Sequence, residues 1–162
     1  MINTNIDKTD IEIASDSDTH DIPAFAEADD IDLNPKLVDN VLKELELFEK
    51  NKDFLKKRVS LESLSLQCGT NTAYLSKIIN HYKKQNFKAY VNDLRLHYVM
   101  NLWTNHKKSR KYSIQDIAGK SGFSNAQSFS KKFQEKFGVS PSSFLKQFNS
   151  NMELENEVRN ES

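Results

Sequence analysis

Hydrophobic residues recur at the three- and four-residue spacing of an α-helix over most of the chain after residue 34. A first helix is predicted from Pro35 to about Lys57, because Asn34 can cap its start and apolar residues then fall on one face. A second apolar face, over residues 87–104, predicts a continuous helix of roughly 27 Å. Strand-like alternation is lacking and the chain has only four Gly and three Pro, so the fold class is predicted to be all-α.

Two copies of one unit flank this long helix, related by a shift of about 53 residues. Ser60 and Ser113 can each cap a short helix, and Gly69 and Gly122 then suit a left-handed turn before a second amphipathic stretch. This order is the layout of a helix-turn-helix. We therefore expect two helix-turn-helix units, at about 59–83 and 113–138, joined by a linker helix at about 87–104.

The formal net charge of zero is a cancellation between segments. Residues 1–35 carry a net charge of −9, residues 36–150 of +12 and residues 151–162 of −3. Residues 1–34 are rich in Asp, Ser and Thr without a sustained period, which favours a disordered acidic leader or linker. The excess of positive charge coincides with the two helix-turn-helix patterns, so DNA contact is favoured over a merely solvated basic surface.

Other patterns argue against several classes of protein. The single cysteine, Cys68, excludes an internal disulfide and a multi-cysteine zinc site, and it is interpreted as a small buried residue. Four scattered histidines lack the paired spacing of metal ligands, so neither metal nor cofactor is expected. No nucleophile–base pair or glycine-rich phosphate loop is present, so the chain is not expected to be an enzyme. Trp103 is interpreted as a packing residue, and a series of phenylalanines is interpreted as core instead of a stacking platform: Phe123, Phe129, Phe133 and Phe137.

Several motifs resemble the DNA-binding domain of AraC/XylS-type bacterial transcription regulators. They are Leu75-Ser76-Lys77-Ile78-Ile79, Phe87-x-x-Tyr90-Val91-Asn92-Asp93-Leu94-Arg95-Leu96, and Ile114-x-x-Ile117-Ala118-x-x-x-Gly122-Phe123-Ser124-x-x-x-Ser128-Phe129. The resemblance covers about 90 residues from Val59 to Phe148. Within it, the sequence around Asn71 to Asn80 is similar to the Bacteroidetes subset of the family. The resemblance implies about seven helices. Together with the segment charges, it gives as the expected domains after the leader one DNA-binding domain at 35–150 and an acidic tail at 151–162. The resemblance also implies that each unit places one recognition helix in successive major grooves of duplex DNA.

The same resemblance identifies the side chains expected to contact DNA. The base-reading residues it implies are Asn71, Thr72, Ala73, Ser76 and Lys77 in the first unit, and Asn125, Ala126, Gln127, Ser130 and Lys131 in the second. Lysine can reach guanine O6 and N7, and Asn or Gln can bond adenine N6 and N7. The residues expected to contact phosphates are Lys83, Lys107, Lys108, Arg110, Lys111, Ser128, Lys132 and Lys136.

Three positions depart from the family pattern. Lys84 stands where Gly is usual before the linker helix, so that turn is expected to be different or mildly strained. Ile79 replaces a usual Phe, and Ala73 offers no large contact to a base edge, so the second unit is expected to be the more specific reader. Arg95 occupies the family's arginine position and is expected to bond helix ends and fasten the linker helix to a unit.

The sequence therefore favours sequence-specific binding of double-stranded DNA for transcription regulation. The alternatives are a helical protein-interaction module and a nonspecific DNA-binding protein. Expected partners are DNA, RNA polymerase and, if the chain is the C-terminal part of a longer sensor, an upstream sensor domain. The expected location is the cytoplasm, in association with the nucleoid. The target sequence, the effector, the oligomeric state and the choice between activation and repression are not readable from the sequence.

Overall fold

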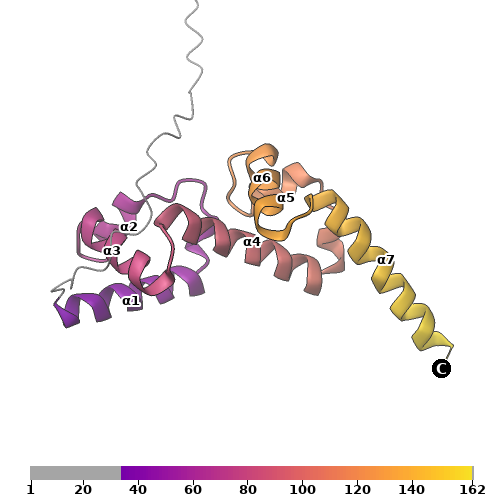
Figure 1. The fold of residues 1–162 in the computed structure, drawn as a ribbon, viewed down its shortest axis with the longest axis horizontal. Coiled ribbons are helices and arrows are strands. Elements are labelled where there is room, and N and C mark those ends of the chain that lie inside the picture. The colour runs from indigo at the N-terminus through magenta and orange to yellow at the C-terminus, as the bar shows by residue number, and fades with distance from the viewer. Residues whose placement is uncertain (1–33, 162) are drawn as a thin grey trace, which may run out of the picture. The chain divides into compact units, whose positions relative to one another are not determined.

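The computed structural model describes residues 34–161, which fold into seven α-helices and two short 3-10 helices (Figure 1). The predictions for residues 1–33 lie outside this range. The elements are α1 (Pro35–Lys50), η1 (Asp53–Leu55), α2 (Leu61–Gln67), α3 (Thr72–Lys83), α4 (Phe87–Asn105), η2 (Lys107–Lys111), α5 (Ile114–Lys120), α6 (Ala126–Phe137) and α7 (Pro141–Asn160). No strand occurs within residues 34–161, which confirms the all-α prediction with its seven helices.

The first helix begins as predicted but ends earlier. Asn34 accepts a hydrogen bond from the backbone N–H of Lys36 at 3.0 Å, and Pro35 is the first helical residue. The helix was expected to reach about residue 57, yet it ends at Lys50, because Lys52 adopts a left-handed backbone (φ 57°) that reverses the chain. This reversal buries Phe54 against the last turn of α1.

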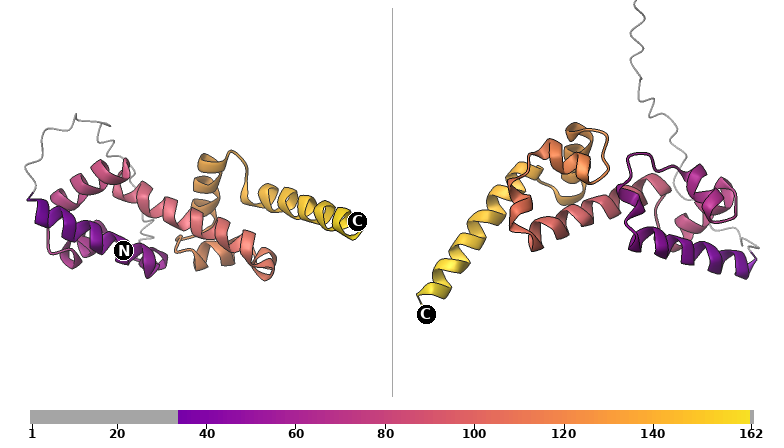
Figure 2. Two further views of the ribbon diagram at one scale, coloured as in Figure 1. Left: turned by 90° about the horizontal axis from the view of Figure 1, so that it is seen from below. Right: turned by 180° about the vertical axis from the view of Figure 1, so that it is seen from behind.

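Two hydrophobic cores share the linker helix α4 (Figure 2). The first half of α4 packs with α1, η1, α2 and α3, and its second half packs with α5, α6 and α7. The second core is centred on Trp103, which is fully buried and stacks on Phe144 with ring centroids 5.9 Å apart. Phe123, Phe129 and Phe133 are buried in this core and Phe137 packs against it, so they do not form a stacking platform.

Cys68 is fully buried in the first core, as expected for a small packing residue. Burial raises the pKa of its thiol to about 11, which keeps it protonated and unreactive at neutral pH.

Left-handed residues occur at equivalent positions of the two units, both in the turn between the two helices of each unit and in the turn that follows the second helix. Gly69 (φ 65°) and Gly122 (φ 85°) begin the turns between the helices of each unit, as the sequence predicts. At the end of α6 the same conformation falls on Gly138 (φ 77°), whereas at the end of α3 it falls on Lys84 (φ 57°). A side chain in this conformation costs about 1 to 2 kcal/mol. The expected strain in the turn before the linker helix is therefore present at Lys84.

Arg95 joins the two cores. From α4 its Nε donates to the carbonyl of Phe54 at 2.7 Å and its Nη2 donates to the carbonyl of Lys56 at 2.9 Å. Both carbonyls belong to the end of η1, so the prediction that Arg95 bonds a helix end is confirmed. The guanidinium also lies 5.7 Å from the ring centroid of Phe123, in the middle of the turn between α5 and α6. Arg95 thereby connects η1, α4 and the second helix-turn-helix.

The last helix continues through the acidic C-terminal segment. Ser140 accepts a hydrogen bond from the N–H of Ser143 at 3.2 Å, and Pro141 starts the helix. No Gly or Pro follows Pro141, so nothing in the sequence stops α7 before Asn160. Residues 151–160 of the expected tail are helical, and Leu154 and Val158 are exposed on them.

Gly122→Ala is expected to destabilise the fold by about 2 to 4 kcal/mol, through the left-handed backbone and an atomic overlap together. A Cβ at this position would lie 2.8 Å from the carbonyl oxygen of Leu55 and 2.9 Å from Nε of Arg95. Gly69→Ala is the matched control, because its backbone is also left-handed but no atom lies within 4 Å of the added Cβ. Urea unfolding should show a loss of only about 1 to 2 kcal/mol for this control. Equal losses in the two variants would contradict the close junction at Gly122.

Candidate nucleic-acid interface

The second helices of both units begin with the same polar cap. Asn71 precedes α3, and its Oδ1 accepts a hydrogen bond from the backbone N–H of Tyr74 at 2.9 Å. Asn125 precedes α6, and its Oδ1 accepts from the N–H of Ser128 at 2.7 Å. Both caps are exposed, so the two helix N-termini, with their partial positive charge, face solvent. Exposed N-termini of this kind can receive phosphate oxygens or base edges.

The residues expected to read bases lie on the solvent side of these helices. In the first unit Ser76 is half-buried and the other four are exposed: Asn71, Thr72, Ala73 and Lys77. In the second unit Ala126 and Ser130 are half-buried and the other three are exposed: Asn125, Gln127 and Lys131. Leu75, Ile78 and Ile79 of α3, like Phe129 and Phe133 of α6, lie in the cores. Each helix thus exposes a polar face to solvent and buries an apolar face in its core.

The cap geometry limits what Asn71 and Asn125 can donate or accept. Their Oδ1 atoms each already accept one backbone N–H, so the second lone pair of that oxygen and the side-chain NH₂ group are the parts left to contact DNA. Two-point bonding to adenine uses both the oxygen and the nitrogen of the amide. Such bonding can coexist with the cap only where the second lone pair of Oδ1 faces the base.

The residues expected to contact phosphates fall into two groups. Those of the first group are exposed on η2 or take part in the cap of α6, and the side chains of the second group bind carboxylates, carbonyls or a ring of the protein. Lys107, Lys108 and Lys111 are exposed on η2, directly before α5. Ser128 is half-buried, and its N–H belongs to the cap of α6.

Arg110 belongs to the second group, which contacts other parts of the protein. Its Nε donates to the carbonyl of Trp103 at 2.6 Å and its Nη2 to that of Thr104 at 3.1 Å. Its guanidinium also lies 4.7 Å from the ring centroid of Phe148. The side chain therefore fastens η2 to the end of α4 and to α7.

Three lysines of the second group are paired with carboxylates. Lys132 bonds Glu135 within α6, and Lys136 bonds Asp93 of α4, each at 2.8 Å. The hydrogen bond from Lys132 lowers the pKa of Glu135 below its ordinary value. Lys83 bonds Glu49 of α1, also at 2.8 Å. Sequence analysis did not find these pairings.

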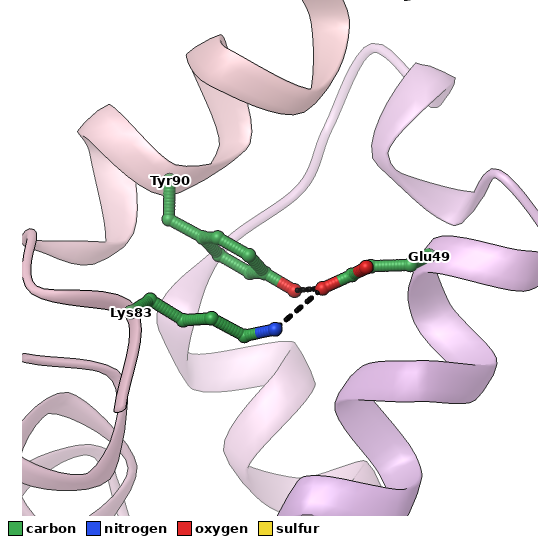
Figure 3. Close-up of polar contacts among 3 residues, drawn as sticks. All are labelled: Glu49, Lys83 and Tyr90. Carbon is green, nitrogen blue, oxygen red and sulfur yellow. Dashed lines mark hydrogen bonds and ion pairs between the residues drawn. The ribbon is translucent and has the colours of Figure 1, made fainter. Parts of the chain in front are cut away.

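Among these carboxylates, Glu49 binds a second side chain in addition to its lysine (Figure 3). Its Oε1 accepts from Nζ of Lys83 at 2.8 Å and from the hydroxyl of Tyr90 at 2.7 Å. Burial alone would raise the pKa of Glu49, but these two donors and the charge of Lys83 outweigh it, so the pKa lies below its ordinary value. Burial, followed by the bond to Glu49, raises the pKa of Tyr90. Because 34 and 41 residues separate Glu49 from its partners, no local sequence pattern indicates them.

Within residues 34–161, no group of three or more His, Cys, Asp and Glu side chains is arranged to hold a metal ion. None of the helices described there is both long enough and apolar enough to cross a membrane.

Comparison with known proteins adds a family and a fold. The family model described as a helix-turn-helix domain matches residues 64–147, which is more than half of the chain. Curated protein sequences give no match.

Solved structures with the same fold are found among bacterial regulators. The C-terminal domain of AraT, a response regulator from Geobacillus stearothermophilus, has a TM-score of 0.57 and 22% identity, over 72% of this chain and 88% of that one. The DNA-binding domain of AdpA in complex with a target DNA has a TM-score of 0.61 and 12% identity, over 69% and 95%. An AraC-type regulator from Chromobacterium violaceum has a TM-score of 0.56 and 21% identity, over 70% and 96%. With its two helix-turn-helix units on one linker helix, the chain belongs to the AraC-type helix-turn-helix family of DNA-binding transcription regulators.

Proposed function

We propose that the chain reads duplex DNA through the N-terminal halves of α3 and α6, placed in successive major grooves. The observation that carries this proposal is the pair of equivalent, exposed, Asn-capped helix N-termini on two packed units. The α4 helix that joins the units has 19 residues. Its length is therefore about 28 Å, close to the roughly 34 Å turn of duplex DNA. As a member of its family, the chain is a regulator and not an enzyme.

Base reading is proposed for two sets of residues, one on each recognition helix. They are Asn71, Thr72, Ala73, Ser76 and Lys77 on the first, and Asn125, Ala126, Gln127, Ser130 and Lys131 on the second. Their exposure on one side of each helix supports the proposal. The AdpA DNA-binding domain, whose structure contains a target DNA, shares the fold and supports it further. The two sets differ in sequence, so the DNA site should be asymmetric.

Phosphate contact is proposed first for Lys107, Lys108 and Lys111, which are exposed on η2. Lys132 is a further candidate, because its partner Glu135 is three residues away on the same helix and both side chains are over one-third exposed. Solvent screens such exposed pairs, so Lys132 can exchange its carboxylate for a phosphate at little cost.

The wider setting of the proposal follows from the family. A DNA-bound regulator acts on transcription through RNA polymerase, which we propose as the protein partner. A sensor domain, in the same polypeptide or in another protein, would supply the signal. DNA binding would place the protein at the nucleoid of a bacterial cytoplasm.

A salt titration on two kinds of duplex tests the function itself. One duplex is selected from a random pool by the wild-type chain, and the other is random. We expect affinity for both to fall with salt, and the selected duplex to bind about 10³-fold or more tightly. Equal affinities would indicate a nonspecific DNA-binding protein, and no salt-dependent affinity would indicate a protein-interaction module.

Neighbouring lysines of α6 separate base reading from phosphate contact. Lys131→Ala is expected to relax the preference at one base position by about 1 to 3 kcal/mol. Lys132→Ala is expected to weaken binding to all sequences alike and to lower the salt slope by about one. Affinities of both variants for the selected and the random duplex provide the measurement. Equal losses on both duplexes for Lys131→Ala would contradict its role as a base reader.

The cap of α6 can be separated from its DNA contact by two substitutions. Asn125→Ser keeps a capping oxygen and removes the amide NH₂, whereas Asn125→Ala removes both. Thermal unfolding should show a loss of about 1 kcal/mol for the Ala variant and little change for the Ser variant. If the NH₂ group contacts DNA, both variants should lose affinity for the selected duplex. Full affinity in the Ser variant would restrict Asn125 to capping.

A further inference from the structure

Three helices of the first unit meet at one carboxylate oxygen. Glu49 is in the last turn of α1, Lys83 is the last residue of α3, and Tyr90 is in the first turn of α4. Oε1 of Glu49 accepts hydrogen bonds from both partners, and Nζ of Lys83 also lies 5.4 Å from the ring centroid of Tyr90. Figure 3 shows the lysine and tyrosine side chains converging on the glutamate.

This cluster holds both sides of the turn between α3 and α4. The turn contains Lys84 in the left-handed conformation, which residues other than glycine rarely adopt. Lys83 and Tyr90 lie before and after it, and both are tied to Glu49 of α1. The corresponding end of α6 has Gly138, whose left-handed backbone carries no such strain. In the first unit, side-chain contacts therefore hold a left-handed turn at the end of α3. In the second unit, glycine adopts the same turn without strain.

The geometry also determines what Lys83 can do. Its side chain is 30% exposed and that of Glu49 is 35% exposed, so this pair is shielded more than the pairs within single helices. Tyr90 is 2% exposed, and its hydroxyl finds its acceptor on Glu49. Moving Lys83 to a phosphate would leave a half-buried carboxylate without its cation.

We propose that Glu49 is a positioning residue for DNA reading, which fixes the direction of α3 through Lys83 and Tyr90. This inference rests on the proposed function, in which the N-terminal half of α3 reads bases. Side chains that recognise a ligand must be held within roughly 0.5 Å and 10 to 20° of their productive geometry. Lys83 consequently acts inside the protein and not on a phosphate.

Selection from a random duplex pool, at a temperature well below the unfolding of each variant, tests the inference. Lys77→Ala and Lys131→Ala first identify which base positions are read by α3 and which by α6. Glu49→Ala is then expected to lose about tenfold in preference at the α3 positions and to keep the α6 positions. Glu49→Gln, which retains an acceptor oxygen of the same shape, should restore part of that preference. A general loss of stability would affect both groups of positions alike.

Lys83→Met supplies a second arm that does not depend on the folding of Glu49→Ala. It should reproduce the loss at the α3 positions, and its salt slope should equal that of the wild type. Lys111→Met is the matched control from the exposed basic run, and it should keep all base preferences and lower the slope by about one. The inference is overturned if Lys83→Met lowers the slope by about one with preferences intact, or if Glu49→Ala keeps every preference.

Failure of the proposed function and failure of this inference give different experimental results. A wild-type chain that selects no sequence would overturn the proposed function and this inference with it. A wild-type chain that selects a sequence also selected by Glu49→Ala would overturn the inference alone.

Discussion

The contacts of Arg95 are the constraint on which the double helix-turn-helix depends. One guanidinium, carried by α4, donates to two carbonyls at the end of η1 and packs on Phe123 at the second unit. The second unit can come this close only because Gly122 lacks a Cβ. A linker helix alone would fix the separation of the units along its axis. Contacts across its side also restrict the rotation of one unit about that axis, as the proposed placement of α3 and α6 in successive major grooves requires.

Within this frame the recognition helices start alike and end differently. The Asn caps of α3 and α6 are equivalent in position and in the N–H they bind. At their C-terminal ends, α3 is held to α1 by Lys83 and Glu49, whereas α6 is held to α4 by Lys136 and Asp93. The ends proposed to face DNA are thus held by local hydrogen bonds to the backbone, and the opposite ends by ion pairs between helices.

The sequence predicted the features that depend on neighbours in the chain. Capping by Asn34, Ser60 and Ser113 needs only a side-chain oxygen two or three residues before an N–H, and the glycine turns need only an absent Cβ. The end of α1 was predicted wrongly, because the left-handed backbone at Lys52 serves the burial of Phe54 and not a local preference of lysine. The partners of Arg110 and of Lys83 were missed because they depend on which helices pack together.

The basic residues also show that a side chain's role depends on the contacts that the fold gives it, and not on its chemistry alone. A basic side chain that is bound by a nearer anion or carbonyl group must leave it before it can contact a phosphate, and sequence gives the number of cations without their partners. Lys83, Lys132 and Lys136 bind carboxylates of the protein, and Arg110 binds carbonyls and a ring. The net charge of +12 over residues 36–150 already subtracts these carboxylates, so the pairings change where the positive charge lies and not its sum. Of the expected phosphate lysines, Lys107, Lys108 and Lys111 of η2 are exposed directly before the second unit. The electrostatic attraction of this domain for DNA is thus expected to be weighted toward the second unit, whose recognition helix also carries Gln127 at the position that Ala73 occupies in α3.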